Sequence, residues 1–304
     1  MIKYLFTLVI LVLAGAQGFS QGCSDAGFCS LGVLKNYTES PAHPTLSIGS
    51  SYGLGEGSTS TINPYLEYGV KSNEHFSYST KITATYATGF LGSVFDAGDV
   101  YGSATYSSKT NSENSLNFIG GVKIPLTTSN DKNRAGKPLS LDYQSSIGTY
   151  DLIGGINYIV HQKWEFDAGV QVPVYQHNKS TFFPDDYTDP RAAKFAPTSN
   201  FRRNSDVLAR VGYYIRFNDS FSLKPNVLGV YHLGTDSYED RSGQRQDITG
   251  SKGITINGAL TAVKTFKNKS ALELIAATPF AVRKIRPDGL TRDLVVNVQY
   301  SIAW

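Results

Sequence analysis

Long hydrophobic runs are almost absent from this chain of 304 residues. A helix that crosses a membrane needs about 20 consecutive apolar residues, and only the N-terminus comes close to that length. The mean hydropathy of -0.21 is slightly negative, whereas a set of apolar helices would raise it. These absences exclude a helical membrane bundle.

An excess of one charge sign is lacking as well. The 28 lysines and arginines nearly balance the 25 aspartates and glutamates, and the formal net charge is +3. No cluster or stripe of basic residues occurs along the chain. A protein that binds nucleic acid needs such a basic surface, so we expect no nucleic-acid partner.

Cysteine is scarce, with only Cys23 and Cys29 present. They follow a segment with a positive residue, a short apolar core and then small residues, which is the pattern of a secretion leader. We predict a signal peptide over residues 1–20 and a periplasmic or lumenal N-terminal segment over residues 21–44. Two thiols this close in an oxidising compartment predict a disulfide between them. Lipidation of Cys23 is disfavoured, since Ser20 stands where a lipoprotein signal has leucine.

Glycine (29) and tyrosine (19) are abundant. After Pro44 the chain consists of short stretches in which apolar and polar residues alternate with period two. The range Phe76 to Tyr86 places aromatic and aliphatic residues at every second position and serine, threonine and lysine between them. Period two puts alternate side chains on opposite faces of a strand. In a membrane barrel one face meets lipid and the other meets the lumen.

We predict strands over about ten to fifteen residues each, at 45–55, 59–71, 75–88, 98–109, 113–125, 148–161, 163–175, 202–217, 220–234, 252–265, 268–281 and 290–304. Every second connection is then tight, and the longest others cover residues 126–147, 176–201 and 235–251. Barrels of the outer membrane have short periplasmic turns and long extracellular loops. The sequence thus predicts an all-β, closed antiparallel transmembrane β-barrel over residues 45–304, with about twelve strands and ten to fourteen compatible.

The last stretch carries apolar residues at every second position and ends on Trp304. A C-terminal apolar strand that ends in an aromatic residue resembles the signal recognised by the barrel-assembly machinery. We therefore expect this machinery as a partner, with outer-membrane lipid and lipopolysaccharide around the barrel. The expected location is the cell outer membrane.

Charged residues on the predicted lumen face are the candidate functional residues. Because charge inside a membrane must pair or meet water, these groups either hold the barrel closed or line a substrate path. Asp151 is the strongest single candidate, since it starts a strand among several glycines. The lumen-lining candidates are Glu67, Lys81, Lys123, Asp151, Glu165, Asp167, Arg210, Arg216, Lys224, His232 and Glu273.

Catalytic and metal-binding patterns are missing from the sequence. His232 is followed by Leu233-Gly234-Thr235, which does not fit the motif of an outer-membrane phospholipase. No arrangement of nucleophile and base and no metal-ligand spacing is visible. We expect neither an enzyme nor a cofactor or metal site.

Two stretches resemble a known family. The segment Gly121-Val122-Lys123-Ile124-Pro125-Leu126 is followed, after a loop, by Gly148-Thr149-Tyr150-Asp151-Leu152. This pattern resembles the barrels grouped as "MetA-pathway of phenol degradation" proteins, which are distant relatives of the long-chain fatty-acid transporter barrels. The resemblance is close over residues 115–175 and weaker elsewhere.

The resemblance implies an outer-membrane channel for passive uptake of small hydrophobic or aromatic molecules. The alternative is a non-transporting barrel that has a structural role or binds a partner through its long extracellular loops. The loop Phe182–Arg203 bears on both, because it combines five aromatic rings with acidic and basic residues. Such a loop either recruits an apolar ligand or packs on itself over the barrel mouth.

Overall fold

The computed structural model describes residues 44–109, 113–288 and 292–304. The predicted leader, the segment 21–43 and the cysteine pair lie outside the described residues. Within the described ranges, no helix has the length and hydrophobicity needed to cross a membrane.

Strands make up most of the described chain. They are β1 (Thr45–Gly55), β2 (Ser60–Lys71), β3 (Phe76–Gly89), β4 (Gly92–Lys109), β5 (Ser115–Pro125), β6 (Thr149–Val160), β7 (Trp164–Gln176), β8 (Asp206–Tyr213), β9 (Ile215–Asn218), β10 (Phe221–His232), β11 (Ser237–Glu239), β12 (Arg245–Asp247), β13 (Gly253–Thr265), β14 (Ala271–Ala281) and β15 (Arg292–Ala303). Short 3-10 helices occur in the connections: η2 (Glu56–Ser58), η3 (Leu141–Tyr143), η4 (Pro184–Asp186) and η5 (Pro190–Lys194).

The described strands form a closed antiparallel barrel. A sheet of 13 strands runs in the order β13-β14-β15-β1-β2-β3-β4-β5-β6-β7-β8-β10-β9, and β13 also pairs with β10. Tyr214 alone separates β8 from β9, and both pair with β10, so they count as one crossing and the barrel has twelve. The β1–β15 pairing joins the first and last strands from Thr45↔Ala303 to Gly55↔Arg292. The predicted fold class is therefore confirmed.

The outer face of the barrel is apolar on every side. Large hydrophobic side chains at every second position of the strands are exposed, for example Ile48 at 61 %, Phe95 at 65 % and Phe280 at 68 %. Water would oppose such a surface, whereas the hydrocarbon of a membrane accepts it. The described strands close into a sheet without an open edge, as a membrane-spanning sheet requires. The barrel thus spans a membrane with this face against lipid.

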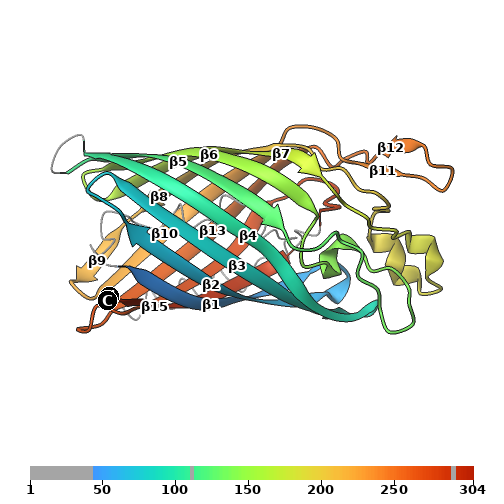
Figure 1. Cartoon of the computed structure of the whole chain (residues 1–304), viewed down its shortest axis with the longest axis horizontal. Coiled ribbons are helices and arrows are strands. Elements are labelled where there is room, and N and C mark those ends of the chain that lie inside the picture. The colour runs from blue at the N-terminus through green and yellow to red at the C-terminus, as the bar shows by residue number, and fades with distance from the viewer. Residues whose placement is uncertain (1–43, 110–112, 289–291) are drawn as a thin grey trace.

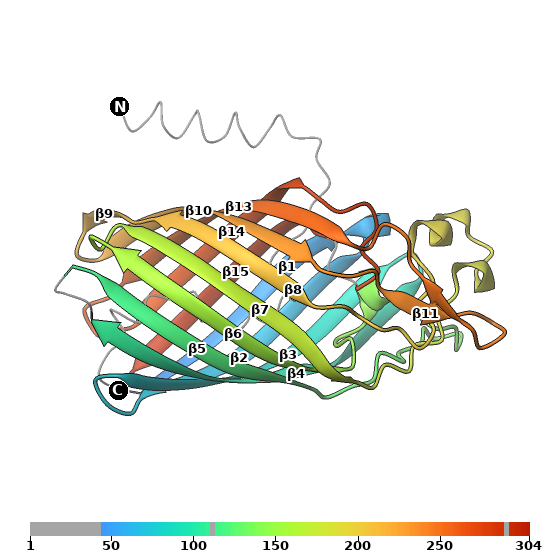
Figure 2. The same cartoon turned by 90° about the horizontal axis from the view of Figure 1, so that it is seen from above.

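The long connections gather at one end of the barrel, here called the loop rim, and the opposite end, the turn rim, has short turns (Figures 1 and 2). The turn rim holds the connections 72–75, 161–163, 219–220 and 266–270 among described residues, together with the end of β15. The loop rim holds the long connections 126–148, 177–205 and 233–252 and the described part of the β14–β15 connection, residues 282–288. The hairpin of β11 and β12 projects from the loop rim (Figure 1).

Two elements differ most from the predicted boundaries. β4 begins at Gly92 instead of residue 98. A two-residue turn follows Gly89, so β3 and β4 stay paired up to Gly89↔Gly92 and form a longer hairpin than predicted. The register of this hairpin shifts between Ile82 and Ala84. The predicted strand 202–217 is interrupted at Tyr214, whose backbone N–H instead donates to the carbonyl of Lys163 at 2.7 Å.

Candidate functional site in the barrel lumen

Side chains on the inner face of β5, β6, β7, β8 and β10 form rows across neighbouring strands. Three consecutive rows lie between Glu165 on the turn-rim side and the Lys123–Asp151 pair on the loop-rim side. The pairing aligns Asn117, Asn157, Asp167 and Arg210 nearest the turn rim. The middle row contains Ile119, Gly155, Gly169, Leu208 and Val230. The row nearest the loop rim contains Ile153, Gln171, Asp206 and His232.

The row nearest the turn rim forms a continuous chain of hydrogen bonds. Asn117 Nδ2 donates to Asn157 Oδ1 at 2.7 Å, and Asn157 Nδ2 donates to Asp167 Oδ1 at 2.7 Å. Arg210 Nε then donates to Asp167 Oδ2 at 2.8 Å. All four side chains are buried, and their partners compensate the loss of water that burial imposes.

Glu165 extends this turn-side network toward β10. Its carboxylate accepts from Lys224 Nζ at 2.8 Å and from the Tyr214 hydroxyl at 3.1 Å, and it lies 3.2 Å from Arg210 Nη2. The break between β8 and β9 places Tyr214 here. Two acids and two bases balance, so the network braces the barrel wall without net charge.

The middle row is apolar and glycine-rich. Gly155 and Gly169 leave space beside the wall, and Ile119 and Leu208 flank them in the row. Ile119 and Leu208 belong to a buried cluster inside the barrel, the lumenal apolar cluster, which consists of Tyr101, Ile119, Ile153, Leu208 and Leu228. Water-filled porins have a polar interior, so an apolar layer between two polar networks distinguishes this lumen.

Lys123 and Asp151 form a buried ion pair near the loop rim. Lys123 Nζ lies 2.8 Å from Asp151 Oδ2 and donates to Thr149 Oγ1 at 2.8 Å, and the two charged side chains are 1 % and 0 % exposed. Gln171 Nε2 also donates to Asp151 Oδ2. The pair joins β5 to β6 at directly opposed positions, which are the positions that carry the family resemblance.

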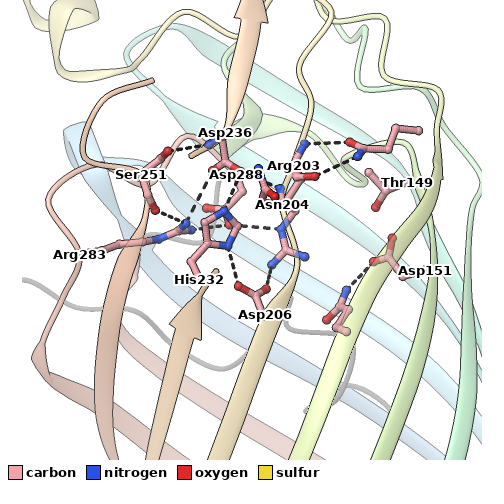
Figure 3. A network of polar contacts seen from close by, with 12 residues as sticks. Thr149, Asp151, Arg203, Asn204, Asp206, His232, Asp236, Ser251, Arg283 and Asp288 are labelled. Carbon is pink, nitrogen blue, oxygen red and sulfur yellow. Dashed lines mark hydrogen bonds and ion pairs between the residues drawn. The ribbon is translucent and has the colours of Figure 1, made fainter. Parts of the chain in front are cut away.

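A second charged group, the loop-rim network, centres on His232 (Figure 3). His232 Nδ1 lies 2.6 Å from Asp206 Oδ1 in the wall, and His232 Nε2 lies 2.7 Å from Asp236 Oδ1 in the loop 233–252. The backbone N–H of Asp236 donates to Ser251 Oγ at 2.8 Å. The imidazole thus connects a barrel strand to a loop.

Two arginines complete the loop-rim network. Arg203 contacts both Asp206 and Asp288, and Arg283 Nη2 donates to Asp288 Oδ2 at 2.5 Å. Burial by itself would raise the pKa of Asp288, but the charges of Arg283 and Arg203 outweigh it and hold this pKa below its usual range. Burial would likewise lower the pKa of Arg203, but Asp206 and Asp288 outweigh it and raise that pKa.

Apolar side chains of the long loops pack over the network. One cluster joins Tyr143 of the loop 126–148 to Phe182 and Phe195 of the loop 177–205 and to Leu91 of the β3–β4 turn. A second cluster joins Leu141, Ile147, Phe201 and Ile248 from three loops. The aromatic-rich loop 177–205 therefore packs on the neighbouring loops at the barrel mouth.

The structure separates the predicted lumen residues into groups. Glu165, Asp167, Arg210 and Lys224 meet in the turn-side network, Lys123 pairs with Asp151, and His232 lies in the loop-rim network. Glu67 and Lys81 are directly opposed on β2 and β3, and Lys81 Nζ lies 3.9 Å from the ring centroid of Tyr65. Glu273 is half-buried on β14, opposite Gln299.

Arg216 lies at the turn-rim end of the barrel, outside these groups. Its side chain is exposed at the turn rim, where Nη1 donates to Gln162 Oε1 at 3.2 Å. Arg216 lies in β9 opposite Ser222 of β10, so it keeps the alternating register, but at this end of the barrel its side chain reaches solvent.

Several site residues were not predicted. Asp206 lies four positions before Arg210 on the same alternating face and inside the predicted strand 202–217, so the alternation alone could have identified it. Arg203, Asp236, Arg283 and Asp288 lie in connections, where no periodicity indicates which way a side chain points. Among the described residues, no group of three or more His, Cys, Asp or Glu side chains could hold a metal ion.

Comparisons with known proteins bear on the fold alone. No protein-family model matches the chain, and no curated protein matches it in sequence. An outer membrane channel from Pseudomonas putida F1 has a TM-score of 0.62 at 15 % identity, over 87 % of this chain and 96 % of that one. The NanC porin has a TM-score of 0.48 at 9 % identity, over 85 % and 98 %.

A third solved structure is the translocator domain of the autotransporter NalP from Neisseria meningitidis, with a TM-score of 0.47 at 8 % identity over 92 % of this chain and 96 % of that one. Only the first of the three exceeds 0.5, and it shows a shared fold. A closed antiparallel barrel with an apolar belt and segregated loops is the architecture of the outer membrane. The chain is an outer-membrane β-barrel.

Proposed function

We propose that the chain is a passive outer-membrane channel for small hydrophobic or aromatic molecules, of the "MetA-pathway of phenol degradation" type that two of its segments resemble. The observation that supports this most is the lumenal apolar cluster inside the barrel. Aromatic side chains of the loops 126–148 and 177–205 pack together at the barrel mouth above it. A wall of this kind favours apolar solutes, because it offers dispersion contacts but no replacement for the hydrogen bonds of a sugar.

Transport itself is the first test. The purified barrel is reconstituted into vesicles that have lipopolysaccharide in the outer leaflet, because apolar molecules cross such a leaflet slowly. We expect faster entry of the fluorescent aromatic amine N-phenyl-1-naphthylamine than in vesicles without protein, and little entry of a disaccharide. Entry of neither probe would favour the non-transporting barrel, and equal entry of both would indicate a general porin.

A matched pair of variants tests the apolar layer. Leu208→Asn introduces an amide of similar size into the lumenal apolar cluster and should slow entry of the aromatic probe. Leu208→Met keeps an apolar side chain of similar volume and should leave entry unchanged. Equal rates of probe entry for the two folded variants would show that transport does not depend on this apolar layer.

A further inference from the structure

The loop-rim network contains a buried imidazole, His232, and it connects the barrel wall to three loops. We propose that His232 is the titratable element of a latch that holds these loops over the mouth, and that deprotonation of its imidazolium at alkaline pH releases them. This regulation rests on the proposed channel function. The latch consists of Arg203, Asp206, His232, Asp236, Arg283 and Asp288.

The hydrogen bonds of His232 define its protonation state in the closed barrel. Both ring nitrogens face carboxylate oxygens, at 2.6 Å to Asp206 and 2.7 Å to Asp236. Carboxylates accept and do not donate, and only the imidazolium donates from both nitrogens. A neutral ring would set a lone pair against one carboxylate inside a site where His232 is 1 % exposed. The closed arrangement therefore requires the proton.

Among the six residues of the latch, the charges balance only when His232 is protonated. Asp206 from β8 and Asp236 from the loop 233–252 contact the ring, and Asp288 from the β14–β15 connection contacts both arginines. Arg203 comes from the loop 177–205 and Arg283 from the β14–β15 connection. Nearby Asp151 on β6 has its own partner, Lys123. Three carboxylates thus face two guanidiniums and one imidazolium, and loss of the proton leaves one buried negative charge unbalanced.

The same contacts decide which parts are released. Asp206 belongs to the wall, whereas Asp236 is carried by a loop, so the bridge through His232 ties that loop to β8 and β10. Arg283 continues the tie through the carbonyl of Ser251 at 2.8 Å. Because the closed state holds a proton that the open state gives up, raising the pH favours opening. Below neutral pH, the lowered pKa of Asp288 keeps that partner charged.

Two measurements on the purified full chain test the latch. The first is single-channel conductance in planar bilayers between pH 6 and pH 9. The second is amide hydrogen exchange of residues 233–252, expressed as protection relative to an unstructured chain at the same pH. For the wild type we expect conductance to rise and loop protection to fall about tenfold or more across this range, as for loss of a charged hydrogen bond.

His232→Gln removes the titration and should give low protection and high conductance already at pH 6. Asp236→Asn removes the loop carboxylate, suits a neutral ring, and should flatten the pH dependence without His232 being changed. His177→Gln is the control, because His177 is exposed at the same rim, and it should keep the wild-type response. Heat-modifiable migration on gels verifies that each variant is folded.

A wild type without pH response, or variants at both positions that retain it, would overturn the latch. Loop protection that changes with pH in a barrel that conducts no ions and admits no N-phenyl-1-naphthylamine would support the latch and refute the channel. Conductance that is independent of pH and of both substitutions would support the channel and refute the latch.

Discussion

At the scale of single residues, the Lys123–Asp151 pair shows how the barrel tolerates charge in its interior. Each partner is almost fully buried and each has a further polar neighbour, Thr149 or Gln171. Burial of a charge costs several kcal/mol, and the partner offsets that cost. Removing one partner leaves the other charge uncompensated, which is worse than removing both.

We therefore predict that Lys123→Met lowers the free energy of unfolding by about 3–5 kcal/mol. The double variant Lys123→Met/Asp151→Leu should recover much of that loss. Denaturant unfolding in detergent micelles measures both. Arg191→Met is the control, since its pair with Asp189 lies on the exposed surface and such pairs contribute little. A single variant as stable as the wild type would show that Asp151 does not need the ammonium.

The sequence could identify inward-facing residues but not their partners. Period two placed Glu165, Asp167 and Arg210 on one face, which is where they lie. The pairing of Asp206 with His232 depends on the register of β8 against β10, which no pattern within a single strand contains. Asp288 reaches the network from a connection, where the backbone has no repeat.

At the scale of elements, the start of β6 depends on one glycine. Gly148 has a positive φ of +70°, and a Cβ there would lie 2.9 Å from the carbonyl oxygen of His177. Its own carbonyl accepts from the His177 N–H at 2.7 Å. This hydrogen bond thus links the residue before β6 to the residue after β7 at the loop rim, next to Thr149 and Asp151.

Gly148→Ala should lower the free energy of unfolding by about 1–3 kcal/mol, because a side chain is strained in the left-handed region and here also meets backbone. Thermal or denaturant unfolding provides the measurement. Gly120→Ala is the matched control on β5, where nothing lies within 4 Å of an added Cβ. Equal stability of the two variants would mean that the β6 turn adapts without cost.

Strand positions were predictable because lipid and lumen impose a strict alternation on each crossing. The limits of β1, β7 and β13 agree with the prediction to within one residue. The break at Tyr214 was not predictable, since Tyr214 continues the alternation and leaves the ladder only through its bond to Lys163. The early start of β4 depends on a tight turn outside the periodic region.

At the scale of the whole molecule, the apolar belt determines where the barrel is stable. Val298 lies on the lipid face of β15 and is 45 % exposed. Val298→Lys should destabilise the inserted barrel by about 2–4 kcal/mol if this position is near mid-bilayer. Folding into lipid vesicles, followed by heat-modifiable migration, measures the effect. Val298→Ala removes bulk without adding charge and should insert normally, and equal insertion of the lysine variant would contradict the assigned face.

The pairing of β1 with β15 also constrains the order of events in folding. Ser47 and Ser301 share a hydrogen bond across this junction although 254 positions separate them in the chain. Contacts so distant in sequence form late, because a long loop must first lose its freedom. Until they form, the sheet carries two unpaired margins that hydrocarbon cannot solvate. Entry into the bilayer and completion of the cylinder are therefore one cooperative step, and a partly assembled sheet has no stable place in the membrane.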